Sequence, residues 1–237
     1  MTEFIPFLLA PSVIILIAAV VANWLAPGPK VTSNLQHLAA GIIFATIATE
    51  VVPELLGGGQ IGAVSIGYGL GMCLIVGVRY FATKNKSESK KEQGSWVGLA
   101  VGGAVDLLID GFLMGVAFSI SKESGILLTI AIAFEVLFLG FTFSVSFAGK
   151  GLQKTSVFFL LCFMSFLLFT GGVGGYLLLG SLPELWKVSA MAFGAVALLY
   201  LVSEELLVEA HEKEETTIGP FLLFIGFGAM LLAAMVV

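Results

Sequence analysis

Long apolar runs separated by short polar stretches make up most of this chain. The runs reach about 20 residues or more, the length that a helix needs to cross the hydrocarbon core of a bilayer. Of the 237 residues, 58% are hydrophobic and only 11% are charged, whereas a soluble domain carries about 25% charged residues. These features exclude a water-soluble globular domain and predict a membrane protein with several spans.

Eight of these runs are candidate transmembrane helices. The connectors hold turn residues and charges, as in PGPK and SLPE, and none is long enough for a separate soluble domain. The first run lacks the basic start and cleavage site of a signal peptide, so we expect it to be the first span. We therefore predict an all-α fold with residues 1–237 forming a single transmembrane domain. The predicted spans are about residues 4–26, 35–57, 60–82, 96–120, 124–148, 155–180, 187–209 and 217–237.

The positions of Lys and Arg predict the orientation of the spans. Cytoplasmic loops carry an excess of these residues, and an even number of spans places both termini on one side. With both termini outside, only Lys122 and Lys187 remain outside. The inner loops and helix ends then hold Lys30, Arg79, Lys84, Lys86, Lys90, Lys91, Lys150, Lys154 and Lys213.

The charges inside the predicted spans are all acidic. A carboxylate at the centre of a membrane helix costs about 2.5–3.5 kcal/mol on insertion scales. Every basic residue lies in a predicted loop or near a helix end, so protons or a cation must offset much of this cost. The acids are Glu50, Asp106, Asp110, Glu135, Glu204 and Glu205, and we predict all six to contact a metal ion.

The spacing of three of these acids predicts a site near the middle of the membrane. Asp106 and Asp110 are four residues apart, so both project from one face of a helix. Glu135 lies near the centre of the next span, and the SKES turn makes the two spans antiparallel neighbours. Converging carboxylates repel one another in a low dielectric unless protons or a cation neutralise them. Oxygen-rich clusters of this kind suit divalent cations.

The remaining acids extend this site into a predicted path across the membrane. Glu50 falls in the outer half of its span, and Glu204 and Glu205 fall in the inner half. We expect His37 and His211 to be surface residues rather than ligands.

Two spans of opposite direction share a short pattern. TEVVPEL at 49–55 matches EELLVEA at 204–210, which aligns Glu50 with Glu205. Inverted repeats of this kind are frequent in transporters, and we predict such a repeat here.

The chain resembles the ZIP family of divalent metal transporters in four predicted spans. FGAVALLYLVSEELLVEAH at 193–211 is similar to the family's Gly-Ala-Met-Leu-Tyr-Val-Val-Val-Glu-Glu-Leu-Ile-Pro-Glu-Ala-His. LAAGIIFATIATEVVPELL at 38–56 resembles a run ending in His-Leu-Ile-Pro-Glu-Ala. DLLIDG at 106–111 takes the place of His-Asn-x-Pro-Glu/Asp-Gly, and AIAFEVLFLG at 131–140 that of a His-containing segment ending in Pro-Glu-Gly. The resemblance implies eight helices, outside termini, a cytoplasmic loop between the third and fourth spans, and divalent metal transport.

The departures from the family pattern fall on its metal ligands. Asp110 keeps the family's acid, but the family's other ligand and motif positions are occupied by Asp106, Glu135, Glu50, Leu107, Ile109 and Leu139. The first three stand in place of His, and Leu139 replaces a Glu, which favours one metal site where the family often has two. Imidazole favours metals such as zinc, whereas carboxylates favour harder cations such as Mn²⁺. Zinc, iron and manganese all stay open as the substrate.

We therefore predict a multi-pass plasma-membrane transporter of divalent cations rather than an enzyme. An intramembrane aspartyl protease would carry its two Asp on different helices, and cation diffusion facilitators have six spans and a soluble tail. The alternative is a ZIP-like protein that carries protons or transports nothing, with carboxylates in a structural or proton-relay role. The expected partners are a divalent cation and the lipid bilayer, with no nucleic acid. A homodimer is among the assemblies that the sequence leaves open.

Overall fold

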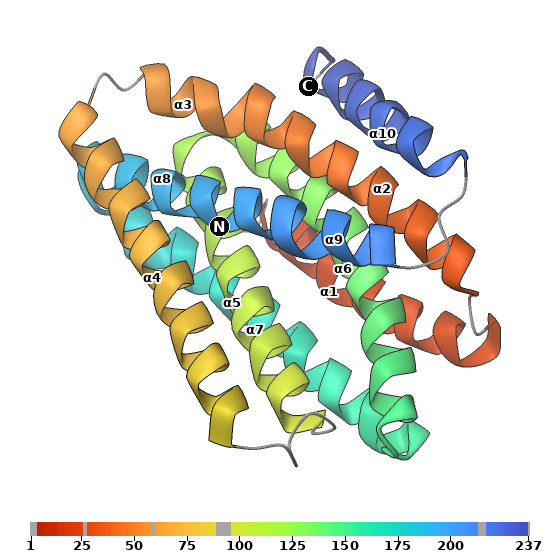
Figure 1. Ribbon diagram of the computed structural model, residues 1–237. Helices are drawn as coiled ribbons and strands as arrows, with labels where there is room; N and C mark the ends of the chain where they lie inside the picture. The colour runs from red at the N-terminus through yellow and green to blue at the C-terminus, as the bar shows by residue number, and fades with distance from the viewer. Residues whose placement is uncertain (1–3, 26–27, 58–59, 89–95, 213–216, 237) are drawn as a thin grey trace.

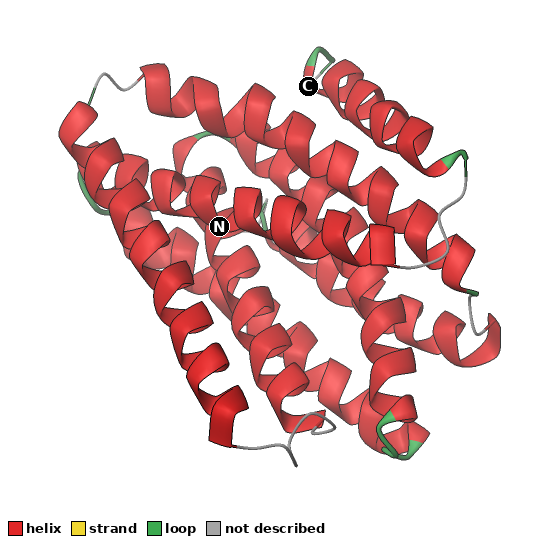
Figure 2. Cartoon of the chain, viewed as in Figure 1, coloured by secondary structure: helices red, strands yellow, loops and turns green. Residues whose placement is uncertain are grey.

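The computed structural model describes residues 4–25, 28–57, 60–88, 96–212 and 217–236, and every regular element in this part of the chain is a helix (Figures 1 and 2). Two of the elements are π-helical segments, η1 and η2, that continue an α-helix. The elements are α1 (Ile5–Leu25), α2 (Pro29–Thr46), η1 (Ile47–Val51), α3 (Val52–Gly57), α4 (Ile61–Glu88), α5 (Trp96–Ile120), α6 (Lys122–Gly149), α7 (Lys154–Gly180), α8 (Glu184–Tyr200), η2 (Leu201–Leu206), α9 (Leu207–Glu212) and α10 (Gly219–Ala234).

Six helical stretches of the described chain are long and apolar enough to cross a membrane: 5–22, 30–57, 100–120, 122–149, 154–180 and 184–204. Two shorter apolar helices, Ile61–Gly77 and Gly219–Ala234, correspond to the third and eighth predicted spans. Apolar side chains such as Phe159, Phe163 and Phe166 are exposed on the outside of the bundle. The protein is thus all-helical, as predicted, with the apolar helices of a multi-pass membrane protein.

The helices extend beyond several of the predicted spans. The α2 helix starts at Pro29, six residues before the predicted start, because proline is favoured at the first helical position, where no N–H partner is needed. The α4 helix continues through residues 83–88, which we expected to lie in a loop. Polar residues continue a helix past the apolar run that marks its membrane part. Residues 89–95 of that predicted loop are outside the described residues.

The helices form two groups, defined by their most extensive contacts. In the first group, α5 packs on α7 and α1 packs on α6. In the second, α2 packs on α10 at the top of the view in Figure 1, and α4 packs on α8 at the left side. The groups meet mainly where α2 contacts α6 and where α5 contacts α8.

Glycines bring the helices of each group into backbone contact. A Cβ atom on Gly111 or Gly115 of α5 would overlap the carbonyl oxygen of Leu168 or Gly172 of α7. A Cβ on Gly41 would overlap α10, and one on Gly67 would overlap α8. Small residues at such crossings are the usual basis of tight helix packing in membranes. Between the groups, the contact of α5 with α8 uses a side chain instead, since Leu113 packs over Gly194.

The two π-helical segments occupy matching positions. The Val52 N–H donates to the Ile47 carbonyl after η1, and the Leu207 N–H donates to the Val202 carbonyl after η2. Each bond joins an N–H to the carbonyl of the fifth residue before it. The alignment of Glu50 with Glu205 pairs Val52 with Leu207 and Ile47 with Val202. Pro53 follows η1, but Val208 stands at the matching position after η2, so proline is not the shared cause. Such π-bulges are rare and occur frequently at functional sites.

Replacing Gly111 with alanine should loosen the contact between α5 and α7. The added methyl group meets backbone atoms that cannot rotate away, so we expect a loss of about 1–3 kcal/mol. The matched control is Gly102→Ala on the same helix, where a Cβ meets nothing within 4 Å. Thermal unfolding in detergent should show a midpoint several degrees lower for Gly111→Ala and no decrease for Gly102→Ala. Equal midpoints for the two variants would contradict the packing described above.

Candidate metal centre

The hairpin of α5 and α6 positions the central acids. The Ser121 hydroxyl oxygen accepts a hydrogen bond from the Ser124 N–H at 3.0 Å, so Ser121 caps α6 immediately after α5 ends. At about 1.5 Å per residue, Asp106 lies about 22 Å before this cap and Glu135 about 21 Å after it. In an antiparallel pair of helices the two acids are therefore level, as the spacing predicted.

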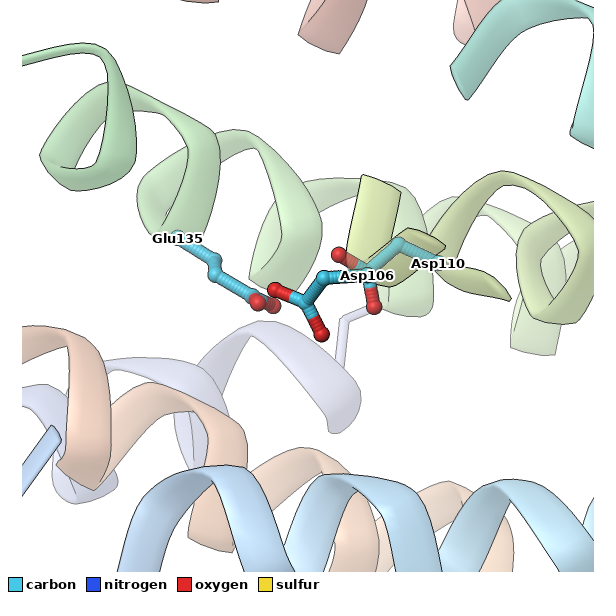
Figure 3. Close-up of side chains that lie close together, drawn as sticks. All are labelled: Asp106, Asp110 and Glu135. Carbon is cyan, nitrogen blue, oxygen red and sulfur yellow. The ribbon is translucent and has the colours of Figure 1, made fainter. Parts of the chain in front are cut away.

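Asp106, Asp110 and Glu135 form a carboxylate triad between these helices (Figure 3). One carboxylate oxygen of each residue lies within 4.8 Å of the others. Figure 3 shows the Glu135 side chain pointing from α6 toward Asp106, with Asp110 one turn further along α5. Asp110 is 3% exposed, Glu135 is fully buried and Asp106 is half-buried. In the described part of the chain, no other group of three metal-binding side chains comes this close together.

The triad cannot hold three negative charges without compensation. Two unit charges 4.8 Å apart repel each other by about 3 kcal/mol at an effective dielectric constant near 20. Burial adds a desolvation cost for each ionised carboxylate. A divalent cation between the three groups replaces the repulsion with attraction, and shared protons are the other means of compensation. Carboxylate oxygens are the donors that Mg²⁺, Ca²⁺ and Mn²⁺ prefer.

Glu50 lies apart from the triad, at the end of α6 where the cap is. Its Oε2 accepts a hydrogen bond of 2.9 Å from the Ser124 hydroxyl, which in turn accepts one from Ser121. Ser124 precedes Glu135 by three helical turns, or about 16 Å. Glu50 belongs to η1 and is half-buried. The sequence did not predict Ser124 as its partner, since nothing in the pattern of either segment marks the contact.

Glu204 of η2 does not belong to the triad. Glu204 is exposed, and the Glu205 side chain lies outside the described part of the structure. The structure thus brings together three of the six predicted metal-binding residues, and the roles of Glu50, Glu204 and Glu205 stay predictions.

The prediction that His37 is a surface residue is wrong. His37 is only 3% exposed, and its ring centre lies 5.3 Å from that of His211. His211 itself is exposed, as predicted. The error has a clear cause, because the contact depends on how α9 crosses α2 and no local pattern encodes that crossing.

Comparison of the sequence with known family models and with curated proteins found no match. The function therefore has to be argued from the site itself.

Glutamine at position 135 should stabilise the metal-free protein. Removing one charge from the triad relieves repulsion and desolvation, for a gain of roughly 1–3 kcal/mol. The control is Glu184→Gln, which removes an exposed acid in the first turn of α8. We expect a higher thermal midpoint for Glu135→Gln in the presence of a chelator, and no increase for the control. A lower midpoint for Glu135→Gln would mean that the carboxylate stabilises the fold without a cation.

Proposed function

We propose that this protein transports a divalent metal cation across a membrane, with the carboxylate triad as its central binding site. The convergence of Asp106, Asp110 and Glu135 inside an apolar helix bundle is the observation that carries the proposal. A site made only to bind could lie at the surface, where carboxylates cost nothing to expose. Ionisable groups buried in membrane helices mark ion pathways by default.

The donor set favours a cation of the manganese or iron(II) class. All three side chains of the triad offer oxygen, and harder divalent ions prefer oxygen to nitrogen. Three carboxylates also carry enough charge to replace much of the hydration shell of a 2+ ion. Zinc stays within the proposal, because it accepts carboxylate ligands at about 2.0–2.2 Å.

The two groups of helices suggest how the cation would gain access from each side. The triad belongs entirely to the group of α1, α5, α6 and α7, in which backbone contacts at glycines join α5 to α7 and α1 to α6. We propose that this group moves against the other one and carries the site with it, as in transporters whose bundles rock or slide. Glu50 would receive the cation at one end, and Glu204 and Glu205 would accept it at the other.

The membrane topology in this proposal follows the resemblance to ZIP transporters. All eight apolar helices would cross the plasma membrane, with both termini outside and an inverted repeat relating α2 to α8. The matching π-helical segments η1 and η2 support the repeat at these two helices. The gradient of the metal or of protons would supply the energy.

Neutral substitutions in the triad should strongly slow uptake. The purified protein in liposomes containing a metal-sensitive dye would be tested with Mn²⁺, Fe²⁺ and Zn²⁺. We expect Asp106→Asn and Glu135→Gln to lower the initial rate at least about tenfold, since each change removes a charged ligand. Glu184→Gln should transport at the parent rate.

Undiminished uptake by Asp106→Ala and Glu135→Ala would contradict this assignment of the site. Proton flux without metal flux in the parent protein would favour the proton carrier instead.

Histidine at position 106 should shift the selectivity toward zinc. The change replaces one oxygen donor with an imidazole nitrogen, which borderline metals prefer. We expect the ratio of Zn²⁺ to Mn²⁺ uptake to rise by about tenfold in Asp106→His. The measurement is a competition assay with both metals present in the liposome medium. An unchanged ratio would show that Asp106 does not contact the transported ion.

A further inference from the structure

The only two histidines of the chain lie against each other, although they are far apart in the sequence. His37 comes from α2 and His211 from α9, and their ring centres are 5.3 Å apart with the planes at 58°. The helices are joined beside the rings, because the Ser33 hydroxyl donates a hydrogen bond of 2.9 Å to the Ala210 carbonyl. His37 is buried while His211 is exposed, and the buried polar ring at this crossing needs a reason, since an apolar side chain would pack there at lower cost.

Each ring is oriented by its own helix. The Nδ1 atom of His37 lies 2.9 Å from the Ser33 carbonyl, and that of His211 contacts the Leu207 carbonyl. A carbonyl can only accept, so Nδ1 carries the proton in both rings and the neutral ring has its lone pair on Nε2. A hydrogen bond from the second nitrogen to a backbone carbonyl is also the arrangement that accompanies metal-bound histidine.

The separation of the rings fits one metal ion between them. Two imidazoles that bind a tetrahedral ion through Nε2, at about 2.0–2.1 Å, place their ring centres about 5 Å apart. The observed separation of 5.3 Å agrees with this value. Imidazole nitrogen favours borderline metals such as Zn²⁺ over the harder ions that carboxylates favour.

We propose that His37 and His211 form a second metal site, which binds Zn²⁺ or a similar borderline ion through both Nε2 atoms. It differs from the triad in its chemistry and in its place, since it connects α2 to α9 whereas the triad lies between α5 and α6. An ion bound here fastens the end of α9 to α2. The site does not depend on transport through the triad, so the two proposals can fail separately.

Zinc binding by the detergent-purified protein, prepared without a polyhistidine tag, tests this site. The Asp106→Asn/Glu135→Gln variant disables the triad and isolates the histidine pair. In this background we expect one equivalent of Zn²⁺ in competition with a chromophoric chelator. His37→Gln and His211→Ala should each weaken the affinity at least about tenfold, because each removes one of two nitrogen ligands. Ser33→Ala is the matched control, since it removes the bond to Ala210 and keeps both rings.

Absence of zinc binding in the triad-disabled background would overturn the proposal. So would an equal loss of affinity in Ser33→Ala and His211→Ala, because the loss would then report only a loosened helix crossing.

A second measurement avoids any dependence on the folding of the variants. Pulsed EPR of Cu²⁺ bound to the unmodified protein detects imidazole nitrogen directly, and the chain has no other histidine to supply it. Coupling to two imidazoles is the expected result. Coupling to one imidazole or to none would overturn the proposal.

Discussion

The repulsion among three buried carboxylates is the constraint on which the rest of this structure depends. Asp106, Asp110 and Glu135 have oxygens within 4.8 Å of one another, and two of the side chains are almost fully buried. Such an arrangement destabilises an empty bundle and stabilises one that holds a cation or protons. The surrounding helices must resist the repulsion, and the glycine contacts between α5 and α7 supply close packing at that position. The fold thus maintains an arrangement that only a positive charge makes favourable.

The division of the helices into two groups places the triad, which lies between α5 and α6, entirely within one of them. Backbone contacts at glycines join α5 to α7, α2 to α10 and α4 to α8. Between the groups, the contacts include the Leu113 side chain over Gly194 and the hydrogen bond from Ser124 to Glu50. Side-chain contacts of this kind can be exchanged during a movement more readily than interlocked backbones can. The π-helical segments lie in the other group, and each carries an acid.

The triad was predictable from the sequence because it depends on local periodicity and one short turn. A spacing of four residues places Asp106 and Asp110 on one face, and the turn before α6 fixes the level of Glu135. The pair of His37 and His211 depends instead on the crossing of two helices that are distant in the chain. The segments η1 and η2 were hidden for a different reason, since apolar residues with helical periodicity do not reveal a hydrogen bond to the fifth preceding residue. The helix ends were also missed, because polar residues such as Lys84 and Glu88 continue a helix that we expected to end with its apolar part.

The measurement that tests the central claim most directly is anomalous diffraction from crystals grown with Mn²⁺, recorded on both sides of the manganese absorption edge. A cation site here predicts an anomalous peak between the carboxylates of Asp106, Asp110 and Glu135, at about 2.0–2.6 Å from their oxygens, the range over which oxygen binds Mg²⁺ and Ca²⁺. Well-ordered carboxylates without a peak between them, in crystals that hold Mn²⁺ elsewhere, would contradict it. The triad would then be a protonated cluster rather than a metal site.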